Sequence, residues 1–573
     1  AKQIQMLGLA VKYTQLLTEN IPSLQGIAAN YGFLFIPGTW MESIQISKGM
    51  ASVLNGYESI TGQINVEMKK PQNSDIFFLN IYSDSDGRIE TNVNTAKPLN
   101  DHWSTMILSH ASVLNQKHDN NHDGFSDMPV HKTFSVFNRW NYDGSRVKSQ
   151  FGMNYLNDSR TGGEMKFGGF ETSQNLYGFT VKNQRIGFYG KTALLLNQDA
   201  GANLALQFWT SMHTLDARFG NQMHLASQNS VYSNLLYQTR LLNSNHQLIS
   251  GISFKSEKIM EKFRDSTDNT LEMVTGAFSQ YTFSGFNGFT LVAGIRTDLN
   301  NRFGWIVTPR LHMKFDIDSV TNVRVSAGIG YRSPQLLSEN LSLLASSRQI
   351  TIIGKVGMEK AQNVGGSLTR YHSFGQNKIT LNLDYYHTRF LQQLVTDLDI
   401  SPQKAVFYSL HGKSYSNSGQ AHLMLLFKKS FEFGIAWRIN EVKTYYTNGM
   451  NNKPLVSKHK GLLTASYFTK WEKWKIDCTL QYNGKSRLPN TAANPQEYQL
   501  QKASPSFFIL HGQITRKFKW LDVYLGSENM LNYTQKQVII SPNDPFGPYF
   551  DSSIVWGPIS GRMVYAGLRL NIK

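Results

Sequence analysis

Residues 36–71 read IPGTWMESIQISKGMASVLNGYESITGQINVEMKKP, and this stretch decides the fold. The segment from Glu42 to Ser47 alternates as a strand, and Gln63 to Lys69 is a second candidate strand. The small-residue loop between them is punctuated by Gly49, Gly56 and Gly62. Glycine allows the backbone to turn tightly or to approach another wall closely. The stretch therefore predicts two strands joined by a tightly folded loop.

The chain after Pro71 has a dominant period of two. In residues 323–332, apolar or aromatic side chains occupy the odd positions, and polar residues or glycine occupy the even positions. The same alternation recurs in residues 379–387 and 564–572. It is required when one face of a strand meets lipid and the other a polar lumen, although a soluble sandwich also alternates. Period alone leaves both folds open.

The connections favour the membrane barrel. We count about 22 candidate strands after Pro71, joined alternately by short and long links. The short links lie at 97–101, 143–145, 198–201, 243–246, 285–288, 316–321, 375–377, 428–430, 470–473 and 517–520. The long links lie at 157–184, 332–360, 391–413, 486–505 and 533–560. Short turns on one rim and long loops on the other are typical of bacterial outer-membrane barrels.

Composition agrees with this fold. Hydrophobic residues make up 40% of the 573 residues and charged residues 17%, while aromatic residues reach 12%. A soluble enzyme usually has more charge and a more apolar core. No run of eighteen apolar residues and no N-terminal hydrophobic region occur, so no helical span is expected. We predict an all-β fold, a 22-stranded antiparallel transmembrane β-barrel.

Several function classes are disfavoured by the sequence. The single cysteine, Cys478, excludes an internal disulfide framework and a thiolate metal cluster. The net charge of +17 is spread along the chain, which speaks against nucleic acid and suits anionic glycolipid surroundings. No G-x-S-x-G, H-E-x-x-H, P-loop or dinucleotide-binding motif occurs, so we do not expect an enzyme.

The stretch 36–71 resembles the closing segment of the plug domain of TonB-dependent outer-membrane receptors of the Bacteroidetes type. In that family, an IE-x-IE-x-x-(K/R)-G strand and a loop ending in YG lead into a GG-x-IN-(I/V) strand. Here Asn55-Gly56 replaces YG and Thr61-Gly62 replaces GG. The segments AGIRTD-x8-VTPRLHMKF, RVSAGIGYRSP and GSENMLNYTQ are also similar to barrel elements of the family. The final strand departs from the family pattern by ending in Lys573 rather than an aromatic residue.

The resemblance implies two domains, the C-terminal part of a plug at 1–71 and an outer-membrane barrel at 72–573. It implies import of a scarce ligand into a Gram-negative cell by plug rearrangement, with a siderophore, haem or cobalamin as the favoured class of metal chelate. Expected partners are the TonB complex, outer-membrane lipid and lipopolysaccharide, the small-molecule ligand and, as an optional partner, a surface lipoprotein. The TonB-contacting segment, a signal peptide and the first half of the plug are expected upstream of Ala1. The alternative is a passive porin or a surface adhesion or assembly protein.

The resemblance also suggests site residues. Residues 18–35 fall in the middle of the plug, where apical turns face the ligand. Amide and phenol groups for a ligand are offered by Asn20, Gln25, Asn30 and Tyr31. The alternative is that these side chains cap turns and pack against the barrel. Lys48 occupies the position where the family has a basic residue that docks the plug onto barrel carboxylates.

One loop has the spacing of a partial calcium site. Oxygen ligands at positions 1, 3, 5 and 9 are supplied by Asp119, Asn121, Asp123 and Asp127, with Gly124 at position 6. Position 12 is Val130, which cannot supply the usual bidentate carboxylate. Asx-rich turns also form without metal, because Asn and Asp bond to their own backbone. The nearby histidines, His118, His122 and His131, match no compact ligand spacing.

Overall fold

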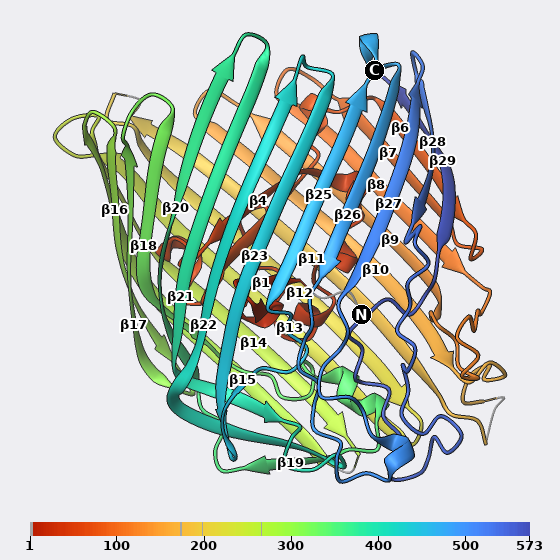
Figure 1. Ribbon diagram of the computed structural model, residues 1–573. Coiled ribbons are helices and arrows are strands. Elements are labelled where there is room, and N and C mark those ends of the chain that lie inside the picture. The colour runs from red at the N-terminus through yellow and green to blue at the C-terminus, as the bar shows by residue number, and fades with distance from the viewer. Residues whose placement is uncertain (1–3, 172–174, 198, 265) are drawn as a thin grey trace.

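The computed structural model describes residues 4–171, 175–197, 199–264 and 266–573. Within these ranges, helices are short 3-10 turns, and none is long and apolar enough to cross a membrane. Strands from β6 onward close into a single barrel. Residues 4–71, hereafter the luminal segment, lie inside it, shown in red in Figure 1.

The wall has the predicted 22 strands within the described residues, each antiparallel to its neighbours, and it closes where β29 pairs with β6. These strands are β6 (Phe77–Asp84), β7 (Ile89–Pro98), β8 (Trp103–Leu114), β9 (Val130–Asp143), β10 (Val147–Gly163), β11 (Gly178–Asn197), β12 (Ala202–Phe219), β13 (Gln222–Arg240), β14 (His246–Phe263), β15 (Ser266–Phe286), β16 (Phe289–Asn300), β17 (Gly304–Asp316), β18 (Thr321–Arg332), β20 (Glu359–Phe374), β21 (Asn377–Asp397), β22 (Lys404–Phe427), β23 (Phe431–Tyr446), β25 (His459–Phe468), β26 (Trp474–Asn483), β27 (Phe507–Lys517), β28 (Leu521–Glu528) and β29 (Met563–Ile572). Two short extra strands, β19 (Gln349–Ile353) and β24 (Gly449–Asn452), pair with β22 and β23.

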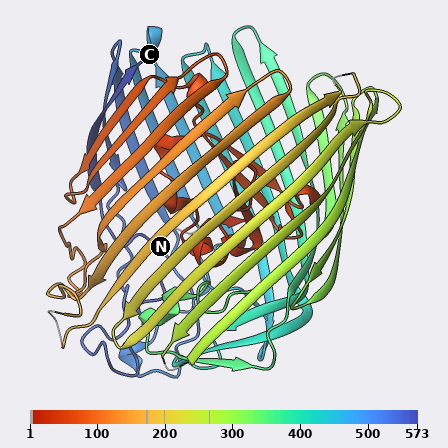
Figure 2. The same cartoon turned by 180° about the vertical axis from the view of Figure 1, so that it is seen from behind.

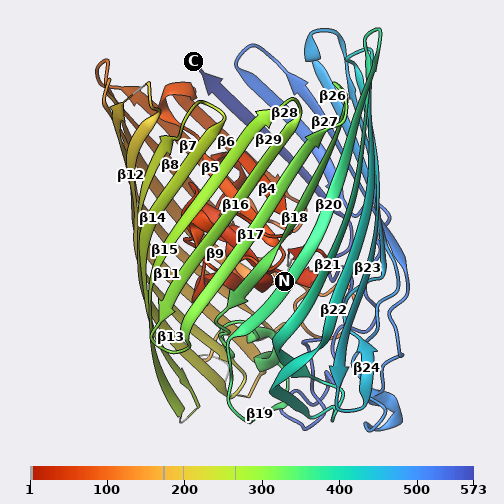
Figure 3. The same ribbon diagram turned by 90° about the vertical axis from the view of Figure 1, so that its left-hand side faces the viewer.

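The predicted alternation is confirmed, and the predicted parity holds in part, because tight turns at 85–88, 220–221 and 301–303 lie at the same rim as the long connections. In β18, Val325 is 40% exposed on the outer face, whereas the neighbouring Ser326 is 7% exposed on the inner face. All ten predicted short links join consecutive wall strands at one rim. Long connections at 115–129, 333–358, 447–458, 484–506 and 529–562 gather at the other rim, the lower end in Figures 1 and 3.

Two predicted long links are shorter than expected. Half of the link predicted at 157–184 is strand, because β10 runs to Gly163 and β11 begins at Gly178. The link predicted at 391–413 is mostly strand, since β21 and β22 contain 21 and 24 residues. A strand needs only about 9–11 residues to cross a membrane. These strands continue beyond the length that crosses a membrane. Antiparallel pairing stabilises the extension, because it continues to satisfy the backbone N–H and C=O groups.

The luminal segment is built on a three-stranded sheet in the order β3-β5-β4. Its elements are β1 (Gln5–Met6), β2 (Leu9–Ala10), η1 (Val11–Tyr13), β3 (Thr14–Thr18), η2 (Gly26–Asn30), η3 (Gly32–Phe35), η4 (Gly38–Trp40), β4 (Met41–Lys48), η5 (Val53–Asn55) and β5 (Gly62–Met68), followed by η6 (Pro71–Asn73). Strands β4 and β5 confirm the two predicted from the stretch 36–71. Gly62 has φ +136°, and a Cβ there would lie 2.0 Å from the Ser47 carbonyl oxygen, so this turn requires glycine.

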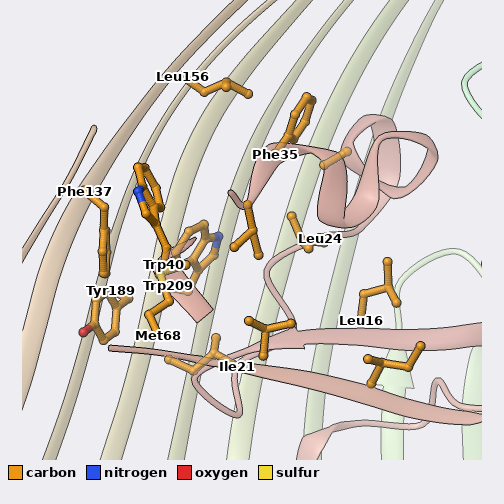
Figure 4. Close-up of a cluster of buried hydrophobic side chains, with 14 of the residues drawn as sticks. Leu16, Ile21, Leu24, Phe35, Trp40, Met68, Phe137, Leu156, Tyr189 and Trp209 are labelled. Carbon is orange, nitrogen blue, oxygen red and sulfur yellow. The ribbon is translucent and has the colours of Figure 1, made fainter. Parts of the chain in front are cut away.

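One flank of the luminal segment packs against the wall through apolar side chains. Figure 4 shows Leu24 and Trp40 of the segment among Phe137, Tyr189 and Trp209, which come from β9, β11 and β12. The rings of Trp40 and Phe137 are stacked with centroids 6.4 Å apart. Seen from behind in Figure 2, these wall strands cross directly in front of the segment. This contact fixes the position of the segment inside the barrel.

Candidate functional site

Cations from the wall reach inward and hold the luminal segment. Arg139 of β9 is fully buried and donates to the Glu19 carboxylate at 3.0 Å and to the carbonyls of Met68 and Lys69 at 3.0 and 3.3 Å. Lys191 of β11 donates to the same carboxylate at 3.0 Å. Burial by itself would raise the pKa of Glu19, but Arg139 and Lys191 outweigh it and hold that pKa below its ordinary value. Glu19 therefore stays ionised.

Among the wall side chains that hold the loop 49–61, Arg310 makes the most contacts with its backbone. Arg310 of β17 donates through Nη1 to the carbonyls of Ala51 and Ser52 at 3.0 and 2.6 Å. Through Nη2 it donates to the carbonyls of Tyr57 and Glu58 at 3.0 and 3.3 Å. The rigid guanidinium fork suits such divided contacts. These backbone contacts add to side-chain contacts of the loop with the wall, such as that of the Tyr57 hydroxyl, which donates to Glu272 at 2.9 Å.

A cavity of about 60 Å³ lies between the luminal segment and the wall, beneath the long connection 333–358. Its polar lining includes Lys12, Gln25, Glu58, Glu257, Arg332 and Glu339. A buried water needs roughly 10–15 Å³ of such volume, so the cavity holds a handful of waters. A larger molecule enters only if the segment or the connection above it moves.

Opposite charges meet on one side of this cavity. Lys255 of β14 donates to Glu58 at 3.1 Å and lies 3.2 Å from Glu257 on its own strand. The Gln25 side-chain amide also donates to Glu58. Wall and luminal segment thus share one hydrogen-bonded ion cluster, and moving the segment breaks it.

On the other side, the wall, the segment and connection 333–358 meet in a second cluster. The Tyr13 hydroxyl donates to Glu359 of β20 at 2.8 Å. Arg332 pairs with both Glu359 and Glu339, and Lys12 lies 3.6 Å from Glu339. Burial lowers the pKa of Lys12 to about 8. A shift of the segment here is transmitted directly to the long connection.

The long connections close over their end of the barrel. Arg348 is 1% exposed, and its Nε donates to the Asp551 carboxylate of connection 529–562 at 2.8 Å. Connection 115–129 and the link between β10 and β11 join connection 529–562 in an apolar cluster that includes Phe125, Tyr177 and Phe550. A buried ion pair and an apolar core therefore hold together loops that are far apart in the sequence.

A family model described as TonB dependent receptor-like, beta-barrel, matches residues 71–530. The chain belongs to this family. The receptor is an outer-membrane protein of a Gram-negative bacterium, and its short turns face the periplasm and its long connections the exterior. No curated protein sequence matches the receptor.

Solved structures share the receptor's fold at low sequence identity. The copper transporter OprC superposes with a TM-score of 0.76 at 11% identity, covering 99% of this chain and 91% of the other. The FrpB iron transporter from Neisseria meningitidis (F5-1 variant) has a TM-score of 0.73 at 13% identity, covering 98% and 93%. The siderophore receptor PirA from Pseudomonas aeruginosa has 0.68 at 10% identity, covering 98% and 92%.

The four residues predicted to bind ligand are not brought together in the receptor. Gln25 lines the cavity described above. Asn20 instead lies at a turn with φ +61°, where its N–H donates to Asn65 at 2.8 Å and its amide to Glu67 at 3.3 Å. Asn20 therefore has the turn-forming contacts that the alternative interpretation described.

The other two lie at the end of η2 and at the turn between η2 and η3. Asn30 ends η2 and is half-buried. The Tyr31 ring stacks on Phe35 with centroids 5.0 Å apart, and burial raises the pKa of Tyr31 to about 12. A ligand-binding role for these residues stays a prediction.

Lys48 contacts the barrel wall. Its Nζ is 2.5 Å from the Asp384 carboxylate of β21, and both side chains are largely buried. The partner that the sequence left unnamed is thus a carboxylate on the barrel wall. The contact joins the end of β4 to the wall opposite the apolar flank.

The candidate calcium loop is folded by its own hydrogen bonds. The Asp119 carboxylate accepts the N–H groups of Asp123 and Gly124 at 3.1 and 3.0 Å. The Asn121 amide donates to Asp123 at 2.9 Å, and Asp127 accepts the N–H of residue 120 at 2.9 Å. In the described part of the chain, no three His, Cys, Asp or Glu side chains converge as metal ligands. Calcium binding stays a prediction.

Proposed function

We propose that this receptor imports a scarce metal chelate of the siderophore, haem or cobalamin class, driven by the TonB complex. In this proposal, residues 1–71 are the C-terminal part of the plug and residues 72–573 are the barrel. Ligand capture takes place beneath the long connections and involves binding and movement rather than bond chemistry. The observation that carries the proposal is a luminal segment that lies inside the barrel and is fastened by many polar contacts beside its apolar flank.

Polar fastening supports a removable plug. An intramolecular hydrogen bond contributes only about 0.5–1.5 kcal/mol net, because water replaces it when it breaks. Contacts such as those of Arg310 with loop carbonyls can therefore be exchanged for water as the segment shifts. An entirely apolar interface would resist that exchange, since apolar surface has no compensating contact with water.

The occupied lumen disfavours a passive porin. A 22-stranded barrel without a plug would enclose a wide lumen, whereas here residues 4–71 lie inside the barrel and pack against its wall. The metal-chelate class is supported by the descriptions of similar structures, which are a siderophore receptor, a copper transporter and an iron transporter.

A reversible tether tests whether the luminal segment must move. A Cβ built on Gly294 of β16 would lie 3.5 Å from the Cβ of Val53 in η5. This separation suits a disulfide, and Cys478 is the only natural cysteine. Val53→Cys/Gly294→Cys should stop uptake when oxidised and regain it after reduction, while the single variant Val53→Cys transports normally under both conditions. Uptake by the oxidised double variant would refute plug movement at η5.

Growth of a deletion strain tests the ligand class. Strains complemented with the wild-type or tethered receptor are grown with iron-siderophore, haem or cobalamin as the limiting nutrient. We expect the wild type alone to restore growth on one of the three. No growth defect on any of them would reject the metal-chelate class. Swelling of liposomes containing the purified receptor in sugar solutions would instead support the porin.

A further inference from the structure

Three consecutive short turns of the periplasmic rim share an unusual composition. The turn after β22 reads FKKSF at 427–431, the next reads FTKWEKW at 468–474, and the third reads RKFKW at 516–520. Each combines lysine or arginine with large aromatic side chains. Elsewhere on the same rim, described turns carry aspartates, as at Asp143 and Asp316. Aromatic side chains also gather at other turns of this rim, such as Phe283 and Phe286, but lysine and arginine are densest beside them in the sector from β22 to β28.

Two of these turns enclose an open hollow of about 670 Å³. Its lining includes Trp471, Lys473, Arg516, Phe518 and Lys519. The indole of Trp471 is 79% exposed and the ring of Phe518 is 55% exposed. Cations of the same turns lie near these rings, Lys470 at 5.8 Å from the Trp471 centroid and Arg516 at 5.4 Å from the Phe518 centroid. Most of the aromatic surface nevertheless faces outward and favours a ligand with an apolar part.

The cations of the hollow have few carboxylate partners. Lys517 pairs with Glu472 at 2.8 Å. By contrast, Lys473, Arg516 and Lys519 form no ion pair within the described part of the chain. The sector therefore presents three uncompensated positive charges, a suitable arrangement for an anion.

The position of Arg516 shows at which level of the membrane the sector lies. Arg516 pairs with Trp474 across β26 and β27, and its guanidinium lies 4.8 Å from the Trp474 ring centroid. The same outward row continues with Ile476 and Ile514, which are 43% and 46% exposed to the lipid side. Arg516 thus lies where the lipid-facing surface meets the periplasmic rim. Phospholipid headgroups occupy that level, and tryptophan is enriched there.

We propose that this sector binds the phosphate headgroup of an anionic glycerophospholipid in the periplasmic leaflet. The guanidinium of Arg516 and the ammonium groups of Lys473 and Lys519 contact the phosphate, while the rings of Trp471 and Phe518 cover the glycerol and upper acyl region. Arginine binds phosphate through paired N–H groups, and each cation near an anionic surface strengthens binding roughly fivefold. The site is separate from the luminal cavity and does not depend on the transported ligand.

Native mass spectrometry of the full chain in detergent tests the proposal. The probes are dioleoyl-phosphatidylglycerol, dioleoyl-phosphatidylcholine and water-soluble glycerol phosphate. The variant Lys473→Gln/Arg516→Gln/Lys519→Gln should bind phosphatidylglycerol about 100-fold more weakly than the wild type, from about fivefold for each of three cations. Phosphatidylcholine and free glycerol phosphate should bind weakly to both.

A matched control removes the same charge elsewhere on this rim, through Lys97→Gln/Arg146→Gln/Lys148→Gln. It should retain wild-type affinity for phosphatidylglycerol. Equal losses in the control and the sector variant would mean that net charge alone acts, and would overturn the site. Tight binding of free glycerol phosphate would assign the sector to a soluble anion and overturn the lipid source.

Hydrogen exchange of the wild type gives a second measurement that needs no variant. In nanodiscs containing phosphatidylglycerol, the amides of turns 468–474 and 517–521 should exchange more slowly than in pure phosphatidylcholine. The turn at 316–321 should not respond. Equal exchange of all three turns in the two lipids would overturn the proposal, even if the triple variant fails to fold. Failure of the import function would leave both measurements unaffected.

Discussion

Replacing Asp551 with asparagine should open the lid formed by the long connections. Asp551→Asn keeps the size of the side chain and an oxygen that can accept the hydrogen bonds donated by Ser553. It removes the charge opposite Arg348, whose side chain is 1% exposed and whose Nε lies 2.8 Å from the carboxylate. The arginine is then a buried cation without its counter-ion. Such a loss is among the most destabilising single changes in a protein.

The free-energy cost of Asp551→Asn follows from the burial of the ion pair with Arg348. Removing one partner of a buried ion pair costs about 3–5 kcal/mol. Arg348 retains contacts of 3.2 to 3.5 Å with the carbonyls of Lys404, Ser401 and Leu398, which places the expected cost at the lower end. At 1.36 kcal/mol for each factor of ten, about 3 kcal/mol raises the opening equilibrium roughly 100-fold.

Hydrogen exchange measures this opening directly. The Ser347 N–H donates to the Phe550 carbonyl at 2.8 Å, and the Ser552 N–H donates to the Ala345 carbonyl at 3.1 Å. Both bonds join the two connections, so both exchange when the lid opens. In Asp551→Asn, these amides should exchange up to about 100-fold faster, while amides within the wall keep the wild-type rates.

Two further variants make the result decisive. Asp143→Asn breaks an ion pair with Lys148 whose side chains are 59% and 57% exposed, and it should change local exchange less than about fivefold. Arg348→Met/Asp551→Asn removes the unpaired charge and should recover part of the protection. If exchange in Asp551→Asn stays within about threefold of the wild type, the ion pair does not hold the lid.

Three other changes test the contacts of the luminal segment and the outer loop. Because the folded pKa of Glu19 lies below its unfolded value of about 4.3, its contribution is present above that pH and is lost as pH falls through the folded pKa. Arg139→Gln should shift this acid loosening to higher pH in hydrogen exchange of the segment, and an unchanged pH profile would contradict the assigned cause. Lys48→Met should destabilise docking of β4 by about 1–2 kcal/mol, seen as faster exchange of its amides. Adding Asp384→Asn should cause little further change, whereas additive effects would mean that the two residues act separately. Asp123→Ala should abolish the heat of calcium binding in calorimetry, and equal heats in the variant and wild type would discard the calcium site.

Much of the wall could be predicted from sequence. Alternation along β18 and the composition of ten short turns depend on neighbouring residues only, so the strand count was correct. The glycines of the stretch 36–71 likewise indicated β4, β5 and the loop between them. Loop lengths were less predictable, because the ladders of β21 and β22 extend well beyond the span that a membrane requires.

The candidate site was harder to predict. Asn20, Gln25 and Tyr31 were grouped because the resemblance places residues 18–35 in the middle of the plug, but their side chains have different surroundings in the fold. Conversely, Arg332 was visible in a polar, inward position of its strand, but nothing local indicated that it would meet Glu339 and Glu359. An inward charge can be read from alternation; its partner cannot.

The sequence by itself determined that this protein is a barrel with a strand-forming segment ahead of it, because period two and turn composition are local properties. Only the tertiary structure decided how that segment is held inside the barrel and how the long connections close one end of the barrel. Arg310 and Tyr57 are 253 positions apart, and Arg348 and Asp551 are 203 apart. Such pairs meet only after the wall has closed, and the low exposure of their surroundings then makes each charge depend on its partner.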